Sequence, residues 1–239
     1  MTFSLITYNI HFNQAYDHLN EVFKNEIVDI ICLQEVETKE NNLKKFENSE
    51  LKLADYTNSF IKFDKIYGVA TFYNSSKFKF VDSQSINLPQ SFLEVLLILI
   101  RGINRPRTVL KTEFLDKKTG KKLTIYNIHC TPWATNGVRV KQLEETLKDT
   151  QTKNKEAVIV TGDFNFPYRR KSLEKIFFKN GFKEATDNIF HTINVRFYQI
   201  FRRWSKLDYI FYKNIKHLET KKIITKRSDH YPILSKFEI

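Results

Sequence analysis

The stretch Val158-Ile-Val-Thr-Gly-Asp-Phe-Asn-Phe-Pro167 is a short apolar run that ends abruptly in a carboxylate and an amide. The run from Val158 to Val160 predicts a buried strand, and Gly162 allows the backbone to turn as it leaves the sheet. Asp163 and Asn165 lie two residues apart, so in extended backbone both side chains project to the same side. Such a pair can orient a proton or hold a phosphate without adding a second negative charge. Asp and Asn also occur at strand ends simply because they favour turns. The pair therefore indicates a functional site only if other strand ends of the chain carry similar side chains.

Polar side chains also end other strand-like runs. The run from Ser4 to Ile10 predicts a first strand with Asn9 near its end, and Val28 to Gln34 predicts a second strand that ends at Glu35. The complete set of strand-end residues holds carboxylates, amides and imidazoles: Asn9, Glu35, His129, Asp163, Asn165, Asp208, Asp229 and His230. The set shows no serine-histidine-aspartate order, no Gly-rich phosphate loop, and no Cys or His spacing typical of structural zinc.

The chemistry of this set indicates a hard cation. Carboxylate and amide oxygens are the ligands that suit Mg²⁺ first, and Mn²⁺ or Ca²⁺ after it. Imidazoles beside such a cation suit proton transfer and stabilisation of a phosphorane-like transition state. Each residue taken singly also has a structural interpretation: Glu35 as a solvated glutamate, and His129 as a core histidine bonded to a carbonyl.

Length and composition indicate one large domain with an excess of positive charge. The chain has 239 residues and no linker divides it, so we expect a single domain over residues 1–239. The net charge of +12 favours a polyanionic partner such as nucleic acid or an acidic membrane surface. Lys far outnumbers Arg, however, and a genome-wide coding bias would give the same excess of positive charge without a polyanionic partner. Cys32 and Cys130 lie in apolar runs and predict buried, reduced thiols.

The N-terminal sequence shows no export signal, because the chain enters the strand Phe3–Ile10 without a charged region followed by an apolar core. We therefore expect a cytoplasmic monomer with no transmembrane segment. The most apolar segment, Phe92 to Ile100, is far shorter than the ~20 residues that a membrane-spanning helix needs. It predicts a core strand or short helix, and the alternative is a membrane-binding or partner surface.

Hydrophobic spacing and turn signals predict the remaining elements. Apolar residues at helical spacing predict a helix over Asp17–Ile27, and further helices after Trp133 and after Lys171. Residues 37–55 are polar and lysine-rich, which predicts a helix or loop on the surface, and they carry no motif. Turn signals predict two strand pairs, which are Val69–Tyr73 with Lys77–Val81 and Arg107–Leu115 with Lys122–Cys130. Hairpins beside strand-helix-strand units indicate a mixed α/β fold with largely antiparallel pairing.

Six segments, taken together and in this order, resemble the endonuclease/exonuclease/phosphatase superfamily, which includes DNase I, AP endonucleases, sphingomyelinases and inositol polyphosphate 5-phosphatases. The resemblance covers nearly the whole chain, and its segments are Thr7-Tyr-Asn9, Leu33-Gln-Glu35, Asn127-Ile-His129, Gly162-Asp-Phe-Asn165, Leu207-Asp-Tyr-Ile-Phe211 and Ser228-Asp-His230. Any one of these segments is a weak signal, but six in register argue strongly against a chance match. The resemblance implies a four-layer α/β sandwich: two mainly antiparallel sheets packed face to face, with helices outside and the site at the strand ends.

The resemblance also implies a division of roles among the strand-end residues. Glu35, with Asn9 beside it, would hold the divalent cation, and Asp229 would supply a further ligand. Asp163 and Asn165 would position the nucleophile and the scissile phosphate. The implied reaction is metal-assisted hydrolysis of a phosphodiester.

Two histidines receive roles from the same resemblance. His230 would act as the general base or hold the attacking water, with Asp208 fixing its tautomer. His129 would be the second imidazole and would contact the phosphate or the leaving group. AP endonucleases of the exonuclease III type carry a tyrosine in that region, which disfavours this subfamily. DNase I-like enzymes orient the histidine with a glutamate on the strand corresponding to Gly68–Tyr73, where this chain has no acid; the nearest is Asp64.

The expected substrate is nucleic acid. Arg169 and Arg170 closely follow Asp163 and, with the Arg and Trp residues of 196–204, suit a groove that grips a phosphate backbone. The structural alternatives are a solvated first helical turn for the arginines and a core anchor for Trp204. We expect a Mg²⁺-dependent nuclease or nucleic-acid repair phosphodiesterase. The alternatives are a phosphodiesterase or phosphatase acting on a phospholipid headgroup, an inositol phosphate or another small phosphate, and a non-catalytic binding module.

Overall fold

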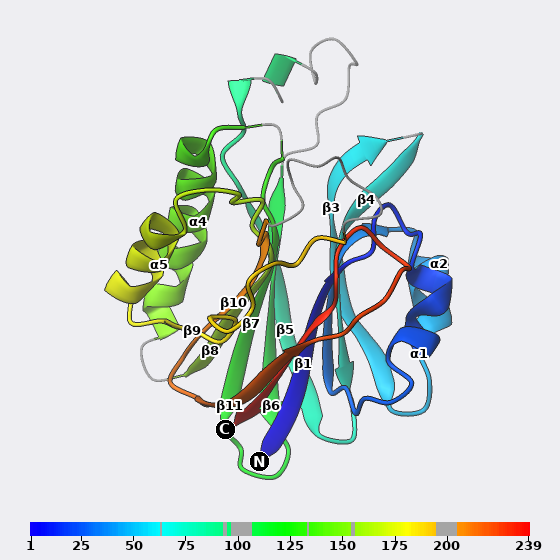
Figure 1. The fold of residues 1–239 in the computed structure, drawn as a ribbon. Helices are drawn as coiled ribbons and strands as arrows, with labels where there is room; N and C mark the ends of the chain where they lie inside the picture. Colours follow the sequence, from blue (N-terminus) through cyan, green and yellow to red (C-terminus); the bar gives the residue numbers. More distant parts are fainter. Residues whose placement is uncertain (63, 93–94, 97–106, 133, 154–155, 195–204) are drawn as a thin grey trace.

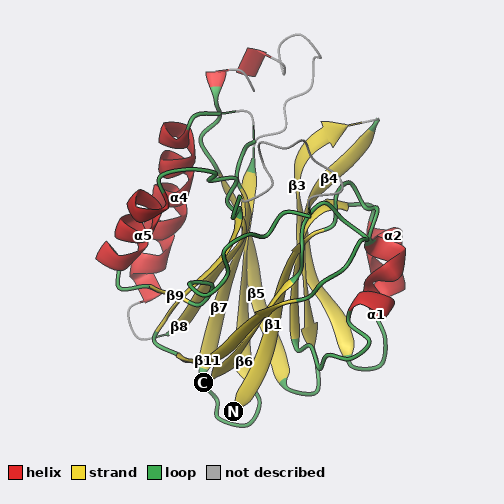
Figure 2. Cartoon of the chain, viewed as in Figure 1, coloured by secondary structure: helices red, strands yellow, loops and turns green. Residues whose placement is uncertain are grey.

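Two six-stranded sheets pack face to face, and the helices lie outside them (Figure 1; Figure 2). The computed structural model describes residues 1–62, 64–92, 95–96, 107–132, 134–153, 156–194 and 205–239. The two chain ends meet at one end of the sandwich, where the amino group of Met1 donates to the carbonyl of Ile239 at 3.0 Å. This arrangement confirms the α/β sandwich expected from the sequence.

The two sheets are mixed. The first has the strand order β11-β12-β1-β2-β4-β3, and the second has the order β5-β6-β7-β8-β10-β9. The strands of the first sheet are β1 (Thr2–Asn9), β2 (Ile30–Glu37), β3 (Leu51–Lys62), β4 (Lys65–Asn74), β11 (Lys216–Lys222) and β12 (Ile233–Glu238). The strands of the second are β5 (Phe78–Asn87), β6 (Thr108–Asp116), β7 (Lys122–His129), β8 (Ala157–Asp163), β9 (Lys183–Glu184) and β10 (Asp208–Lys213). Pairing is parallel for β1 with β2 and for β7 with β8, so each sheet brings two carboxyl ends to one edge.

Helices cover the outer face of each sheet (Figure 1). Those beside the first sheet are the 3-10 turn η1 (Tyr16–His18), α1 (Leu19–Val22), α2 (Glu40–Leu43) and the 3-10 turn η2 (Lys44–Phe46). Those beside the second are α4 (Asn136–Thr150), the 3-10 turn η3 (Gln151–Lys153) and α5 (Arg170–Lys179). Strand β8 is buried along its whole length, with Ile159 packed between the sheets and Val158 and Val160 in the cluster under α4 and α5. Burial on both faces explains why this strand reads as a continuous apolar run.

The predicted helix over Asp17–Ile27 is shorter than expected. Helix α1 ends at Val22, and no side chain caps its first turn at His18. So short a helix depends on packing, and the residues that pack are Leu19 and Phe23. Ile27, which matched the helical spacing, is 79% exposed. The helices expected after Trp133 and Lys171 are present as α4 and α5.

One predicted strand pair is confirmed and the other is wrong. Strands β6 and β7 pair as expected. Strand β4 pairs with β2 and β3, whereas β5 pairs with β6 in the other sheet. The turn after Asn74 therefore carries the chain from one sheet to the other, a path that turn chemistry does not distinguish from a hairpin. Strands β3 and β11 were not predicted, and β3 begins at Leu51 inside a segment expected to be helix or loop. Both lie at edges of the first sheet and are only partly buried, so neither has the continuous apolar run of a central strand.

The apolar stretch Phe92–Ile100 is described only in part. Phe92, Val95 and Leu96 are helical and exposed, so they do not belong to the core. The rest of the stretch lies outside the described residues, as does the segment 195–204 with Trp204. Over the described ranges, we find no helix with the length and apolar character needed to span a membrane.

A buried polar link joins the two sheets. Gln34 Nε2 on β2 donates to Asn127 Oδ1 on β7 at 2.8 Å, and Asn127 Nδ2 donates to the Ala70 carbonyl at 3.0 Å. Both amides are fully buried. An unpaired buried amide is costly, so this link favours one arrangement of the two sheets over others. Two residues of the segments that carry the family resemblance thus stabilise the fold.

Gly162 lets the backbones of β7 and β8 approach closely just before the site. Its φ is 137°, and a Cβ atom there would lie 1.9 Å from the Ile128 carbonyl oxygen. We expect Gly162→Ala to lower the free energy of unfolding by about 3 kcal/mol or more, because strain and a backbone clash add. Gly120→Ala is the control, since its φ is 70° and no described atom lies within 4 Å of the added Cβ; it should cost only about 1 kcal/mol. Urea titrations of both variants measure the difference, and equal losses would contradict this explanation.

Candidate active site

Three neighbouring strands of the second sheet bring a histidine and two carboxylates into one row. His129 ends β7 and lies beside Asp163 on β8, and Asp163 lies opposite Asp208 on β10. Each of the three residues is 1% exposed. Ionisable groups at this depth are costly unless they pair with one another or with a ligand, so the row is a candidate functional site.

The first sheet contributes Asn9 and Glu35 from adjacent strand ends. Glu35 stands at a bulge in β2, where the pairing with β4 shifts between Gln34 and Val36, and its φ is 56°. A bulge re-aims a side chain that regular alternation would send elsewhere. Asn9 Nδ2 donates to Glu35 Oε1 at 3.2 Å and to Asp163 Oδ2 at 3.0 Å. One amide therefore joins carboxylates that come from the two sheets.

A left-handed turn after β1 wraps the Glu35 carboxylate. His11, Phe12 and Asn13 have φ values of 48°, 51° and 69°. The backbone N–H of Phe12 donates to Glu35 Oε2 at 3.2 Å, and that of Asn13 donates to the Glu35 carbonyl at 3.0 Å. His11 Nδ1 lies 3.0 Å from Asp229 Oδ1. The turn thus holds Glu35 in place and ties it to the segment that carries Asp229.

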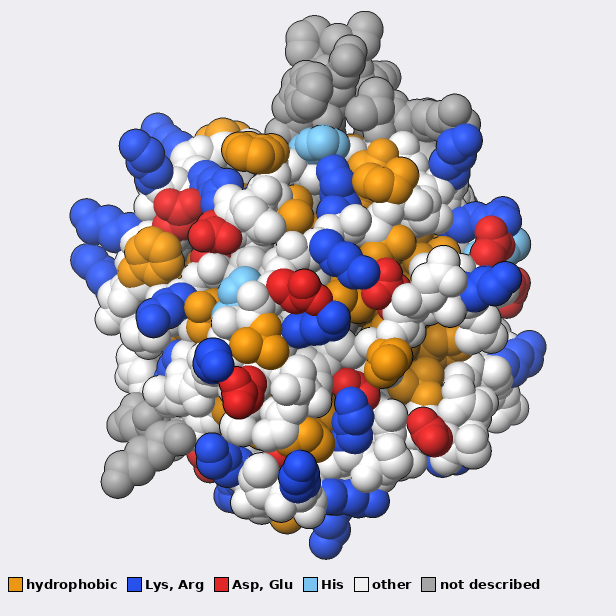
Figure 3. All heavy atoms as spheres, turned by 60° about the horizontal axis from the view of Figure 1, so that its bottom comes forward, with side chains coloured by type: hydrophobic (Ala, Val, Ile, Leu, Met, Phe, Trp, Pro, Cys, Tyr) orange, Lys and Arg blue, Asp and Glu red, His pale blue; other side chains and the backbone are white. Residues whose placement is uncertain are grey.

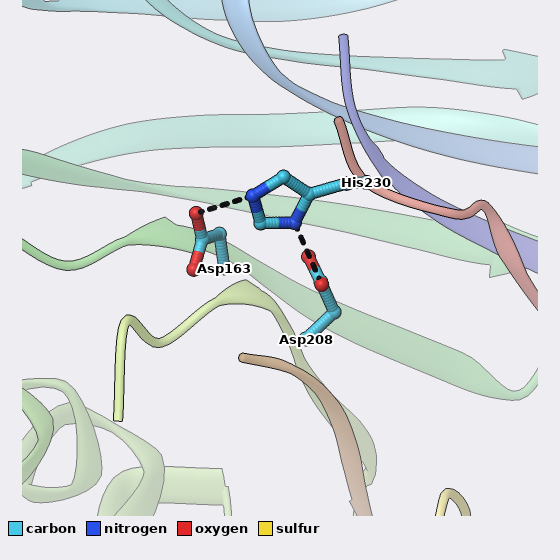
Figure 4. Close-up of side chains that lie close together, drawn as sticks. All are labelled: Asp163, Asp208 and His230. Carbon is cyan, nitrogen blue, oxygen red and sulfur yellow. Dashed lines mark hydrogen bonds and ion pairs between the residues drawn. The ribbon is translucent and has the colours of Figure 1, made fainter. Parts of the chain in front are cut away.

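Asp163 contacts residues from several segments of the site, and Figure 4 shows its contact with His230. Its Oδ2 lies 3.7 Å from His129 Nε2 and 3.7 Å from His230 Nε2. Its Oδ1 accepts the backbone N–H of Asn165 at 2.9 Å, and Asn165 Nδ2 donates to the Cys130 carbonyl at 3.0 Å. Asn165 has a φ of 49°, so the extended backbone expected from the sequence does not continue. The two residues meet through an Asx turn instead of strand alternation.

Asp208 keeps a proton on one ring nitrogen of His230. His230 Nδ1 lies 2.8 Å from Asp208 Oδ2 (Figure 4), and because a carboxylate only accepts, Nδ1 carries a proton. The Nε2 atom then faces Asp163. Burial alone would lower the pKa of His230, but the carboxylates of Asp208 and Asp163 outweigh burial and hold this pKa well above its usual value. Thr192 Oγ1 accepts the backbone N–H of Asp208 at 3.2 Å and helps to position it.

His129 has a different environment. Its Nδ1 lies 3.4 Å from Arg107 Nη1, and its Nε2 lies 3.6 Å from Glu35 Oε1. Among the described residues, no hydrogen-bond partner reaches this Nε2. The ring of Phe60 packs edge-on against the imidazole, with centroids 5.8 Å apart. Burial, together with the positive charges of Arg107 and His230, holds the pKa of His129 well below its usual value.

The donor set fits a hard divalent cation. Burial raises the pKa of Asp163 to about 7, and burial with the charge of Asp229 raises the pKa of Glu35, so both carboxylates would gain from a nearby positive charge. In the described part of the chain, ligand atoms of Asp163, Asp208 and His230 lie within 4.8 Å of one another. Asp208 and His230 bond each other, whereas Glu35 and Asp163 both turn an oxygen to one amide nitrogen.

The two arginines expected to bind substrate lie at the start of α5. Arg169 is exposed and has a φ of 61°. Arg170 donates to Glu174 Oε1 at 2.6 Å and to Glu184 Oε1 at 3.2 Å. Carboxylates of the chain itself therefore engage Arg170, and a substrate contact from either arginine stays a prediction.

Two residues of the site, His11 and Arg107, were not predicted from the sequence. His11 lies two positions after Asn9, and the alternation rule that linked Asp163 to Asn165 would have marked it. Arg107 gave no local signal, because its contact with His129 joins separate segments of the second sheet. Asp64, the nearest acid in the sequence, is exposed.

Comparison with protein-family profiles identifies the family of this chain. A profile of the Endonuclease/Exonuclease/phosphatase family matches residues 6–230, a span that holds every strand-end residue of the cluster. The chain belongs to this family. The family is hydrolytic, which fits buried carboxylates and imidazoles gathered at strand ends.

Solved structures share the fold. The chain is similar to an endonuclease/exonuclease/phosphatase from Bacteroides vulgatus, with a TM-score of 0.77 and 19% identity over 100% of this chain and 99% of that one. It is also similar to a mannosyl-6-phosphatase of Bacteroides thetaiotaomicron (TM-score 0.71, 19% identity, 99% and 100% covered). D. rerio TDP2 complexed with a single-strand DNA product gives a TM-score of 0.73 at 17% identity, with 100% and 99% covered. At these identities the likeness shows the fold alone. A search of curated protein sequences finds no match.

Proposed function

We propose that the chain is a divalent-metal-dependent phosphodiester hydrolase whose substrate is nucleic acid. The observation that carries the proposal is the convergence of Glu35, Asp163 and His230, from distant parts of the sequence, in one buried cluster. A fold gains little stability from burying several ionisable groups at one point, so function is the better reason for them. Family membership narrows that function to hydrolysis of phosphoric esters.

In this proposal Glu35 holds the cation, with Asn9 beside it and Asp229 as a further ligand. Mg²⁺ is the first candidate and Mn²⁺ or Ca²⁺ the alternatives, because carboxylate and amide oxygens suit hard cations. When bound, the ion supplies charge neutralisation at the phosphate oxygens. The bond from the Phe12 N–H and the turn at residues 11–13 keep the Glu35 carboxylate in one orientation.

The remaining residues act on water and on the phosphate. With a cation bound nearby, its positive charge would lower the raised pKa of His230, and the neutral ring would then accept the proton of the attacking water through Nε2 while Asp208 holds its Nδ1–H and stabilises the imidazolium that forms. Asp163 and Asn165 orient the water and the scissile phosphate. His129 contacts a phosphate oxygen or the leaving group.

Two observations support nucleic acid as the substrate. The net charge is +12, and the lysine and arginine side chains are spread widely, since Figure 3 shows many of them, interspersed with acidic ones, on the side of the molecule that carries the chain ends. The fold is also that of a TDP2 structure that holds a single-strand DNA product. Arg169, exposed shortly after β8, is proposed to contact the phosphate backbone, with Arg170 beside it. A cytoplasmic, monomeric, single-domain enzyme remains part of the proposal.

Exposed apolar side chains near residue 92 favour a second class of substrate. Phe92 is 83% exposed, and Val95 and Leu96 are exposed with it. Exposed apolar side chains suit contact with a lipid surface, so a phospholipid headgroup, or an inositol phosphate or other small phosphate, is the alternative substrate.

A substrate panel tests the proposal. Plasmid DNA, abasic duplex, single-stranded RNA, sphingomyelin, inositol phosphates and mannose 6-phosphate are each incubated with enzyme in Mg²⁺ and in chelator. We expect Mg²⁺-dependent cleavage of at least one nucleic acid and none in chelator. Cleavage of lipid or small phosphates alone would favour the second class. Cleavage of no substrate, or equal cleavage in chelator, would contradict a metal-dependent hydrolase.

A further inference from the structure

Arg107 is a buried cation beside one imidazole of the site, and neither the sequence nor the family resemblance gave it a role. We propose that Arg107 is a positioning residue that fixes His129 in the tautomer whose Nε2–H donates to an oxygen of the scissile phosphate. The inference rests on the proposed function, because it assigns His129 a task in that reaction. It concerns which ring nitrogen carries the proton, and it follows from the donors and acceptors around the ring.

The contact between Arg107 and His129 determines the tautomer. Arg107 Nη1 lies 3.4 Å from His129 Nδ1. A guanidinium has only donors, so the imidazole nitrogen that faces it must accept. The proton of the neutral ring therefore lies on Nε2. A carboxylate at the same place would require the opposite, because it would accept a proton from Nδ1.

Aromatic packing holds the guanidinium in place. Arg107 is 6% exposed, and its Cζ lies 4.6 Å from the centroid of the Phe60 ring. Phe60 stacks on Tyr67, with centroids 5.7 Å apart and an interplanar angle of 21°, and its edge meets the His129 ring. The guanidinium thus packs on Phe60, which Tyr67 supports, and the hairpin β3–β4 helps to hold its direction toward His129.

The Nε2–H of His129 faces the reacting groups. Nε2 lies 3.6 Å from Glu35 Oε1 and 3.7 Å from Asp163 Oδ2, beyond ordinary hydrogen-bond length. His129 is 1% exposed, and within the described ranges its Nε2 has no hydrogen-bond partner. A buried N–H without an acceptor costs free energy, and a bound ligand that supplies an oxygen removes this cost. In the proposed reaction that oxygen belongs to the scissile phosphate.

The two histidines of the site are therefore set to opposite tautomers. Asp208 makes the Nδ1 of His230 a donor, so in the neutral ring Nε2 is the nitrogen that can take a proton. Arg107 makes the Nδ1 of His129 an acceptor, which leaves its Nε2 as a donor. His129 then stabilises negative charge on a phosphate oxygen without giving up its proton, and His230 is the residue that moves one.

The tautomer can be measured directly. Protein labelled with 15N-histidine gives long-range 1H–15N correlation spectra, and a His129→Gln variant assigns the His129 signals. We expect the wild-type ring to show a protonated Nε2 and an unprotonated Nδ1, with and without Mg²⁺. Arg107→Lys, which keeps a donor, should preserve this pattern, whereas Arg107→Glu should invert it. Arg107→Met is an uncharged, similarly sized variant and should give a mixture of tautomers.

Kinetics of the same variants separate positioning from folding. Arg107→Glu should lower kcat about 10²-fold or more with little change in KM, and Arg107→Lys should recover most of the loss. Arg139→Met is the matched control, because Arg139 is 5% exposed and donates to the Thr131 carbonyl at 2.9 Å, not to His129. It should lower the melting temperature without altering the His129 spectrum.

Three results would overturn the inference: a wild-type ring protonated at Nδ1, a wild-type pattern retained in both Arg107→Glu and Arg107→Met, or a His129 spectrum altered by Arg139→Met as well. Failure of the proposed function is distinguishable from these results. An enzyme inactive on every phosphate ester would refute the function, while the spectra of the folded protein would still decide the tautomer.

Discussion

His230→Ala is expected to lower turnover by about 10²- to 10⁴-fold, the range observed when a general acid or base is removed. His230 is the imidazole whose Nε2 faces Asp163 at 3.7 Å while Asp208 holds its other nitrogen at 2.8 Å. Without the ring, the site loses the imidazole that would hold the attacking water beside Asp163. Steady-state rates on the preferred substrate at saturating Mg²⁺ measure the effect.

Two further variants show whether the effect comes from chemistry. Asp208→Asn keeps the shape of the partner but removes its charge, so it should lower turnover less than His230→Ala does. His217→Ala is the control, since His217 lies on β11 and bonds Thr220 outside the site. It should leave turnover unchanged. Near-native turnover of folded His230→Ala enzyme would remove His230 from the mechanism.

The second large effect is expected on the binding of the cation. Glu35→Gln preserves the size of the side chain and removes its charge, so the half-saturating Mg²⁺ concentration should rise at least about 10-fold. The carboxylate accepts from Asn9 and from the Phe12 backbone, and a glutamine oxygen can keep only part of this pattern. Activity measured across a Mg²⁺ titration gives the shift.

Glu37→Gln is the matched control for that titration. Glu37 ends the same strand, but its carboxylate pairs with Lys65 at 2.9 Å. It should leave the Mg²⁺ titration unchanged. A normal titration of the Glu35 variant, or an equal shift in both variants, would count against Glu35 as the principal ligand.

The residues of the cluster that could be predicted from the sequence are those with carboxylate, amide or imidazole side chains beside a predicted strand. Asn9, Glu35, Asp163 and His230 were identified because each ends an apolar run or precedes one, and a run of that kind predicts a buried strand. Parallel pairing then brings the ends of β1 with β2, and of β7 with β8, to common edges. The structure brings these ends together, as hydrogen bonds from Asn9 to both Glu35 and Asp163 demonstrate.

Contacts between segments that lie far apart in the chain could not be predicted from local sequence patterns. The contact of Arg107 with His129 depends on the packing of segments far apart in sequence, and no spacing rule encodes it. The left-handed φ at Glu35 is held by the bulge in β2 and by the bond from the Phe12 N–H, so residue propensity does not reveal it. The same limit explains why the turn after Asn74 was read as a hairpin: sheet membership is decided by what each strand packs against.

The most direct test is the position of a bound ion. Crystals of the enzyme soaked in MnCl₂ and measured at the manganese absorption edge locate the ion by its anomalous scattering. We expect one strong peak within coordination distance of a Glu35 carboxylate oxygen and beside Asp163, displacing the Asn9 Nδ2 contact between them. A peak elsewhere that leaves Glu35 uncoordinated, or no peak in crystals of active enzyme, would contradict the proposed metal-dependent mechanism.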